Sequence, residues 1–451
     1  FQFLQSITNT LEKYITDAIE NEDCSKTMFL INHFEKFLTH KNLLTHNMMG
    51  AIKGELGCAY YYLGNLLKAK ELLEEHLSKI SKSDSKNQGQ IARALVYLGN
   101  VYRELGDYEK AKKVIEQSLV IYKNPLYENH IGTARALGNL GNVYRNLGDY
   151  KKAERFLEQS FTIYKKYFSE DHAGVAQILV YLGVVSRAQG EYDKAKRLLE
   201  KSLTIYKKHF SENHVDIAWA LAYLGTVYRE QGEYEKAKNL LEQSLIIYKM
   251  HFSETSSDIA WALGHLGNVY RNLGYYEKAE KFLEQSLTIY KKHISANNVN
   301  NVKVALILAA LENIWREQGN YEKAKSLGSN LTTYEKFYGT IHMKDGRTLQ
   351  DLGGVYLLRN HLKTAEILIK KALDIFQKNK NPERHMCLEA LAELYLKKSI
   401  QAMNEENKNK SQNFKIKAVS YLRQALEIVK AHFSEDSPHI IRIQTKLNNI
   451  K

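Results

Sequence analysis

Arginine recurs at one fixed place in this sequence, three residues before a series of regularly spaced glycines. An asparagine often stands three residues earlier still. The planar guanidinium of arginine grips carboxylate or phosphate through two parallel hydrogen bonds, and asparagine can pair with a peptide backbone as both donor and acceptor. This pattern predicts recognition of an acidic chain. The residues concerned are Arg103, Arg145, Arg187, Arg229, Arg271 and Arg316, with Asn100, Asn142, Asn268 and Asn313.

The glycines reveal an internal repeat, which is the strongest signal in the chain. Asn360 takes the place of the glycine in a later copy, and a final, interrupted copy ends in AVSYLRQALEIV. Since only three prolines interrupt 451 residues, long helices are permitted almost throughout. The glycines Gly64, Gly106, Gly148, Gly190, Gly232 and Gly274 lie 42 residues apart, and Gly319 follows after a longer linker.

One copy, ALVYLGNVYRELGDYEKAKKVIEQSLVIY from Ala94 to Tyr122, predicts two helices joined by a tight turn. Gly99 lies on the apolar stripe of the first helix and permits a close approach of the second. Gly106 suits the left-handed conformation that ends a helix, and Asp107 suits the N-cap of the next helix. A single hairpin cannot bury its apolar stripes, whereas a stack of hairpins can.

The Leu-Gly-x-x-Tyr of each first helix and the alanine of each second helix, such as Ala111, resemble the pattern of the tetratricopeptide repeat family. The 42-residue period and linkers such as Ser-Glu-Asp-His at 169–172 look like the kinesin light chain subtype. This resemblance implies an all-α fold, a right-handed alpha-alpha superhelix of about eight to nine helical hairpins.

In that family, the slots held here by the recurring arginines and asparagines face a concave groove. Trp219 and Trp261 fall at another groove slot, nearer the start of the first helix. The resemblance therefore predicts a groove that binds an extended, acidic segment, with the tryptophans as apolar anchors. A second interpretation stays open, in which the arginines pair with glutamates of the adjacent helix.

The sequence predicts three regions. Residues 1–47 form an N-terminal helical cap or degenerate repeat, residues 48–380 form the repeat array, and residues 381–451 form a degenerate C-terminal repeat with a capping helix around Ser437 to Asn449. The polar run QAMNEENKNKSQNFK within the last region is expected to be a mobile loop.

The composition of the chain indicates which class of partner to expect. Lys+Arg exceeds Asp+Glu, giving a net charge of +13, which favours an acidic protein or peptide. Lysines are spread over all faces, and aromatic residues do not recur regularly along the groove, so nucleic acid is disfavoured. The three widely separated cysteines favour a reducing, cytoplasmic setting over disulfides, and no membrane-spanning run is evident.

No nucleotide-binding, metalloprotease or serine hydrolase motif occurs, so we expect no enzymatic activity, no cofactor and no metal. The preferred function is a protein–protein interaction scaffold. An alternative is the ligand-sensing repeat region of a STAND-type signalling ATPase, because INHFEKFLTH at 31–40 looks like the segment joining the two parts of such proteins. The oligomeric state stays open.

Overall fold

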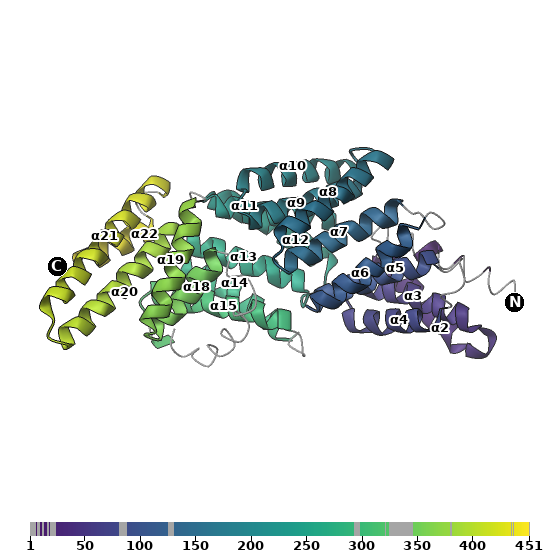
Figure 1. The fold of residues 1–451 in the computed structure, drawn as a ribbon, viewed down its shortest axis with the longest axis horizontal. Helices are drawn as coiled ribbons and strands as arrows, with labels where there is room; N and C mark the ends of the chain where they lie inside the picture. Colours follow the sequence, from purple (N-terminus) through teal and green to yellow (C-terminus); the bar gives the residue numbers. More distant parts are fainter. Residues whose placement is uncertain are drawn as a thin grey trace. The chain divides into compact units, whose positions relative to one another are not determined.

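The computed structural model describes residues 24–80, 88–124, 130–292, 298–320, 346–378, 381–433 and 437–450, together with a few isolated positions. Throughout these ranges the regular elements are helices, and no strand occurs among them. The predicted all-α repeat fold is confirmed (Figure 1).

Successive helices pair into antiparallel hairpins, each with a first and a second helix. Before the array lie α2 (Cys24–Thr39) and a 3-10 turn, η1 (Lys41–Leu43). In seven of the hairpins within the described residues, the two helices pack against each other: α3 (His46–Tyr62) with α4 (Leu66–Lys79), α5 (Gln88–Glu104) with α6 (Tyr108–Tyr122), α7 (His130–Asn146) with α8 (Tyr150–Tyr167), α11 (Val215–Glu230) with α12 (Tyr234–His251), α13 (Ser257–Asn272) with α14 (Tyr276–Lys292), α18 (Gly346–Leu358) with α19 (Leu362–Lys378), and α20 (Arg384–Asn404) with α21 (Lys408–His432).

Four further helices complete the series. The repeat pattern also covers α9 (Ala173–Ala188) and α10 (Tyr192–His209). Helix α15 (Asn298–Glu317) is the first helix of a further copy, and residues 324–345 after it lie outside the described ranges. Helix α22 (Pro438–Asn448) follows the last hairpin.

The local predictions for one hairpin hold in detail. A Cβ on Gly99 would lie 2.3 Å from Cγ1 of Ile115 in the second helix, so the two helices approach too closely for any side chain there. Gly106 ends α5 with φ 82°, and the carboxylate of Asp107 accepts a hydrogen bond from the backbone N–H of Lys110. Asn360 takes over the left-handed position with φ 63°.

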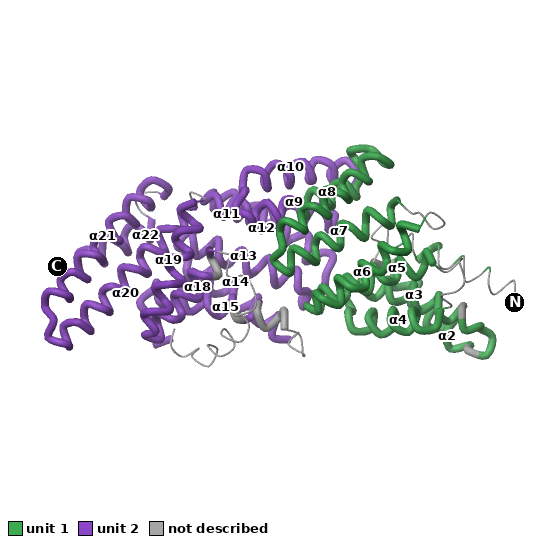
Figure 2. Tube along the Cα trace, in the orientation of Figure 1, with its two compact units in different colours: residues 1–181 green, residues 182–451 purple. Residues whose placement is uncertain are grey.

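The chain divides into two compact units, residues 1–181 and residues 182–451, and the division falls within α9 (Figure 2). In each unit the first helices of neighbouring hairpins contact one another directly: α3 with α5 and α5 with α7 in unit 1, and α11 with α13, α13 with α15 and α18 with α20 in unit 2. The first helices therefore form the inner layer of each stack, which is the side expected to carry the groove.

One expectation about the C-terminal region is wrong. The polar run after Lys398 is not a mobile loop, because α20 continues to Asn404 and α21 starts at Lys408. The run contains neither glycine nor proline, and Ala402 and Ser411 are buried between the two helices. Ser399 and Ser411 are hydrogen-bonded to each other at 2.8 Å. Glu406, with φ 60°, makes the turn between the helices.

Two other regional predictions concern the ends of the chain. The expected terminal helix is present as α22, and α2 lies in the predicted N-terminal cap. Most of residues 1–23, where a further helical pattern is expected, lie outside the described ranges. The boundaries of the three regions remain predictions.

Candidate functional site

Every predicted arginine lies in the last turn of a first helix. The position three residues before the helix-ending glycine is called the arginine slot below, and the position three residues earlier the asparagine slot. The side chains that surround these slots differ from one copy to the next.

In unit 1 the arginine slots hold Arg103 and Arg145. The guanidinium of Arg103 is largely buried and lies 2.6 Å from the carboxylate of Glu104. Arg145 is half-buried, and its Nε donates a hydrogen bond of 2.6 Å to Oδ1 of Asn142. The asparagine therefore orients the guanidinium of the same repeat, a role that repeat spacing alone did not predict.

Asn100 holds the asparagine slot of the preceding hairpin. Its side chain is 8% exposed. Its Oδ1 is buried and accepts no hydrogen bond within the described part of the chain. An unsatisfied buried carbonyl carries a free-energy cost of about 1–3 kcal/mol.

Tyrosines accompany these polar slots in unit 1. Tyr61 and Tyr97 meet edge to face with ring centroids 5.7 Å apart. Burial raises the pKa of the Tyr61 hydroxyl, although the neighbouring Arg103 opposes the rise. Neutral tyrosines beside cationic arginines provide both an apolar ring and a hydrogen-bonding hydroxyl.

In unit 2 each arginine slot lies beside a carboxylate of the same unit. The Arg187 side chain is 25% exposed and lies 3.9 Å from Glu230. Arg229 is buried, pairs with the same Glu230, and has its Nη1 3.3 Å from Nδ1 of His265.

The two remaining arginines pair with distant parts of the chain. Arg271 is fully buried, and its Nη1 donates to Oδ1 of Asp351 at 3.2 Å. Arg316 Nη1 donates to Oε2 of Glu393 at 2.9 Å. Internal pairing, the interpretation left open by the sequence, therefore describes these two residues as well as Arg103, Arg187 and Arg229. The partners of Arg271 and Arg316 belong to later hairpins rather than to the adjacent helix.

The remaining predicted residues lie on the same inner layer. Asn313 is buried and donates to the carbonyl oxygen of Ala309 at 2.9 Å. Asn268 is half-buried, and its Nδ2 donates to the carbonyl oxygen of Gly264 at 3.1 Å. These amides are thus partly used in stabilising their own helices.

The tryptophans form part of a continuous aromatic row on α11 and α13. Trp219 packs edge-on against Tyr223 with centroids 6.0 Å apart, and Tyr223 contacts Trp261 at 5.1 Å. Trp261 in turn lies 4.0 Å from His265. All four rings are half-buried, so each presents an edge or face to solvent.

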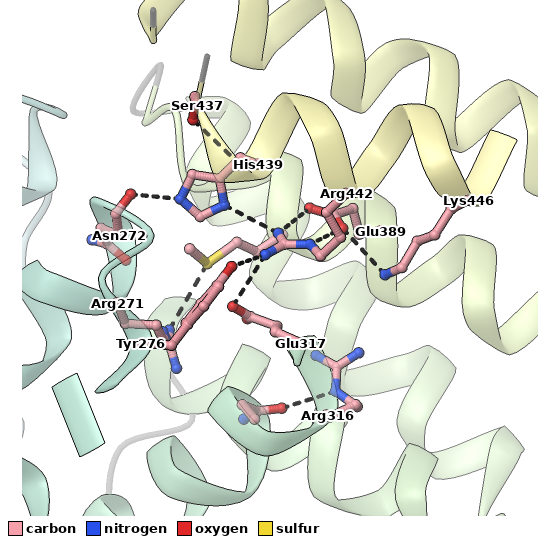
Figure 3. A network of polar contacts seen from close by, with 12 residues as sticks. Arg271, Asn272, Tyr276, Arg316, Glu317, Glu389, Ser437, His439, Arg442 and Lys446 are labelled. Atoms are coloured by element: carbon pink, nitrogen blue, oxygen red, sulfur yellow. Dashed lines mark hydrogen bonds and ion pairs between the residues drawn. The ribbon is translucent and has the colours of Figure 1, made fainter. Parts of the chain in front are cut away.

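The C-terminal helix α22 joins unit 2 through a buried polar network (Figure 3). Arg442 donates from Nη2 and Nε to the two carboxylate oxygens of Glu389, at 2.7 and 3.0 Å, and also lies 3.5 Å from Glu317. Lys446 adds a bond of 3.2 Å to Glu389. Burial raises the pKa of Glu389, but Arg442 and Lys446 outweigh it and hold that pKa well below its usual range.

His439 connects the same helix to α13. Its Nε2 lies 2.6 Å from the backbone carbonyl oxygen of Asn272, and its Nδ1 lies 3.1 Å from Nη2 of Arg442. Since a carbonyl only accepts and a guanidinium only donates, the imidazole must be neutral with its proton on Nε2. Burial lowers the pKa of His439 well below its usual value, consistent with the neutral form.

The acidic partners in unit 2 were missed by reasoning from the sequence. Counted back from the left-handed residue that follows each first helix, Asp351 occupies the same slot as His265. Counted in the same way, Glu393 occupies the slot of Trp261. The late hairpins thus carry carboxylates at two slots where α11 and α13 carry rings. Comparing these slots between copies would have found the signal.

Two searches of the described residues bear on other kinds of site. No group of three or more histidine, cysteine, aspartate or glutamate side chains is arranged to hold a metal ion there. None of the helices described here is both long and apolar enough to span a bilayer.

Several solved structures are similar to this chain, and three of them follow. A Rap protein complexed with competence and sporulation factor is 14% identical and aligns over 94% of this chain and 99% of its own, with a TM-score of 0.53. BtubC (BKLC) from P. vanneervenii is 19% identical over 51% of this chain and 92% of its own, with a TM-score of 0.41. A kinesin light chain with nearly identical TPR-like repeats from Podosopora anserina is 23% identical over 48% of this chain and 100% of its own, with a TM-score of 0.35.

No curated protein matches the sequence. The model of the tetratricopeptide repeat matches residues 48–124, 90–166, 132–208, 174–250 and 216–292. These overlapping matches run through the hairpins from α3 to α14 and cover more than half of the chain. The chain therefore belongs to the tetratricopeptide repeat family.

Proposed function

We propose that this chain is a non-catalytic scaffold that binds an extended, acidic segment of a partner protein along its first helices. The observation that carries the proposal is the regular series of arginine slots on the inner layer, with half-buried Arg145 reachable by a partner. Packed helices lie about 8–10 Å apart, and an extended peptide advances about 3.3 Å per residue. A carboxylate at about every third residue would therefore meet successive arginines.

The aromatic residues support the same mode of binding. The half-buried rings of Trp219 and Trp261 suit apolar side chains of a partner. Specificity would come from this combination of charge and ring contacts.

The first prediction concerns Arg145. Replacing Arg145 by methionine should weaken binding of a fluorescein-labelled oligo-glutamate peptide by about tenfold, or about 1.4 kcal/mol, because a charge-assisted hydrogen bond is lost. Fluorescence anisotropy measures the affinity. The matched control is Arg155→Met on α8, since Arg155 is exposed on a second helix and stacks only against Phe156.

Equal loss in the two variants would show that the probe responds to net charge rather than to the inner layer, and the proposal would fail. A labelled single-stranded DNA of similar charge tests the nucleic-acid alternative. Binding of DNA that is tighter than peptide binding and that falls steeply with salt would favour that alternative.

A second candidate is a ligand-sensing role within a larger signalling protein. It is favoured by the Rap structure, which contains a bound factor and shares the overall fold at a TM-score of 0.53. In this role the same inner layer would hold a short free peptide rather than a segment of a folded partner. Isothermal titration with oligo-glutamate peptides that have free or blocked termini would separate the two, because a sensor of free peptides should depend on the terminal charges.

A further inference from the structure

The inner layer of unit 2 is occupied by carboxylates of the same chain. Three polar side chains on α13 and α15 are paired with acidic residues of later hairpins. The pairs are Arg271 with Asp351, Arg316 with Glu393, and Asn272 with Glu383, whose nearest atoms lie 3.2, 2.9 and 2.7 Å apart.

These pairs involve the residue types that the arginine and asparagine slots were predicted to recognise. A charge can be buried only when it is paired and hydrogen-bonded, and the Arg316 side chain is 6% exposed with Glu393 at 16%. Breaking such a pair from one side is strongly unfavourable, but exchanging one carboxylate for another keeps the arginine satisfied.

We propose that Glu383 and Glu393 hold the place of an acidic partner, so that unit 2 contains a second section of binding surface that is masked by its own last hairpin. The masked section comprises Asn272 and Arg316, whereas Arg271 stays paired with Asp351 of α18. The section becomes available when α20–α22 move away from α13 and α15, and its ligand is an extended acidic peptide segment. This inference rests on the proposed function, because Arg316 occupies an arginine slot and would bind the same chemistry.

The contacts that close the masked section are mostly polar, which suits exchange. His439 bonds to the carbonyl of Asn272, and Arg442 bonds to Glu389 and contacts Glu317 and Tyr276 (Figure 3). At the end of α11, Nδ2 of Asn381 donates to Oε2 of Glu230 at 3.2 Å.

The closure also has an apolar part. Phe433 stacks against Tyr234 with centroids 5.6 Å apart, and Pro438 packs on Gly274 so closely that a Cβ there would lie 2.7 Å from its Cγ. A partner that supplies carboxylates would replace the polar contacts and leave these apolar ones to be exposed.

The first test uses the unmodified chain. Binding at one site that requires opening at another must, by linkage, promote that opening. Saturation with the oligo-glutamate peptide should accelerate amide hydrogen exchange in α22 and in the first turn of α20, while exchange in α5 and α7 slows. Unchanged exchange in α22 at saturation would overturn the inference.

The second test opens the closure by substitution. Arg442→Met removes the contacts to Glu389 and Glu317 and should tighten probe binding by about fivefold to tenfold, the lower part of the usual range for coupled sites. Adding Arg316→Met should abolish this gain, because Arg316 supplies it once Glu393 has moved away. Lys446→Met, which removes only the 3.2 Å bond to Glu389, is the milder variant if Arg442→Met does not fold.

The outcomes separate this inference from the proposed function. If the unmodified chain does not bind the probe, or binds it without involving Arg145, the proposed function fails. If the chain binds through Arg145 but the opened variants show faster exchange in α22 and no gain in affinity, only the masked surface is wrong. A gain that survives Arg316→Met also contradicts it.

Discussion

The arginine slots show how one residue type acquires different roles in successive copies of a repeat. Arg145 is half-buried and held by an asparagine of its own helix, whereas Arg271 is fully buried and held by Asp351. The local sequence around the two arginines is nearly the same, GNVYRNLG in both cases. What differs is the side chain that reaches each guanidinium from elsewhere in its unit.

At the same scale, the close helix crossing at Gly99 makes a sharp prediction. Gly99→Ala should destabilise the hairpin by about 1–3 kcal/mol, the usual cost of overpacking, because the new methyl would collide with Ile115. The control lies in the same helix: Gly89→Ala meets no atom within 4 Å and should stabilise by about 0.5–1 kcal/mol through helix propensity. Amide exchange in α5 reports both changes, and equal effects would refute the packing argument.

Residue roles that depend on local geometry could be predicted from the sequence. The cap at Asp107, the left-handed Gly106 and the close approach at Gly99 each follow from neighbours a few positions away. The pairing of Arg271 could not, because Asp351 lies 80 positions along the chain and reaches it only through the packing of unit 2.

At the scale of helices, α22 is held by groups whose charge depends on pH. His439 faces Arg442 on its own helix, Glu389 and His385 on α20, the aromatic ring of Phe433, and the carbonyl of Asn272 on α13. A protonated imidazole would lose its acceptor for Arg442 and place a second positive charge beside it. The contact thus requires neutral His439.

This requirement gives the direction of a pH effect. Burial lowers the pKa of both His439 and His385 in the folded chain, so the unfolded or undocked state binds more protons. The stabilisation from these residues is complete above the ordinary histidine pKa of about 6.5 and is lost as the pH falls below it. Amide exchange in α22, corrected for intrinsic rates, should therefore accelerate between about pH 7.5 and 5.5.

The substitution His439→Gln provides the control for that experiment. Glutamine keeps one donor and one acceptor but does not titrate, so most of the acceleration in α22 should disappear. An equally steep acceleration in this variant would assign the effect to other groups.

The lengths of α20 and α21 were harder to predict than their existence. Residues such as Lys, Asn, Gln and Glu between 401 and 417 looked like a polar loop. Several of them are acceptable in helices, however, and the alternation of exposed positions with buried Ala402 and Ser411 fixes the hairpin. Tertiary packing, rather than the composition of the run, decides where these helices end.

For the molecule as a whole, the repeat period was sufficient to predict a stack of hairpins with first helices inside. Each hairpin repeats the same short-range solution, so its fold is largely a local property. The division into two compact units was not predicted, and neither was the closure of the inner layer of unit 2 by its last hairpins. Both depend on small differences between copies that accumulate along the stack.

The most direct test of the central claim is to locate a bound acidic segment. An oligo-glutamate peptide carrying one benzophenone group would be photo-crosslinked to the chain, and the attachment points would be mapped by mass spectrometry. The proposed function predicts crosslinks on α5 and α7, around Arg103 and Arg145, and their loss in the Arg145→Met variant but not in Arg155→Met. Crosslinks concentrated on α6 and α8, or equally reduced in both variants, would contradict it.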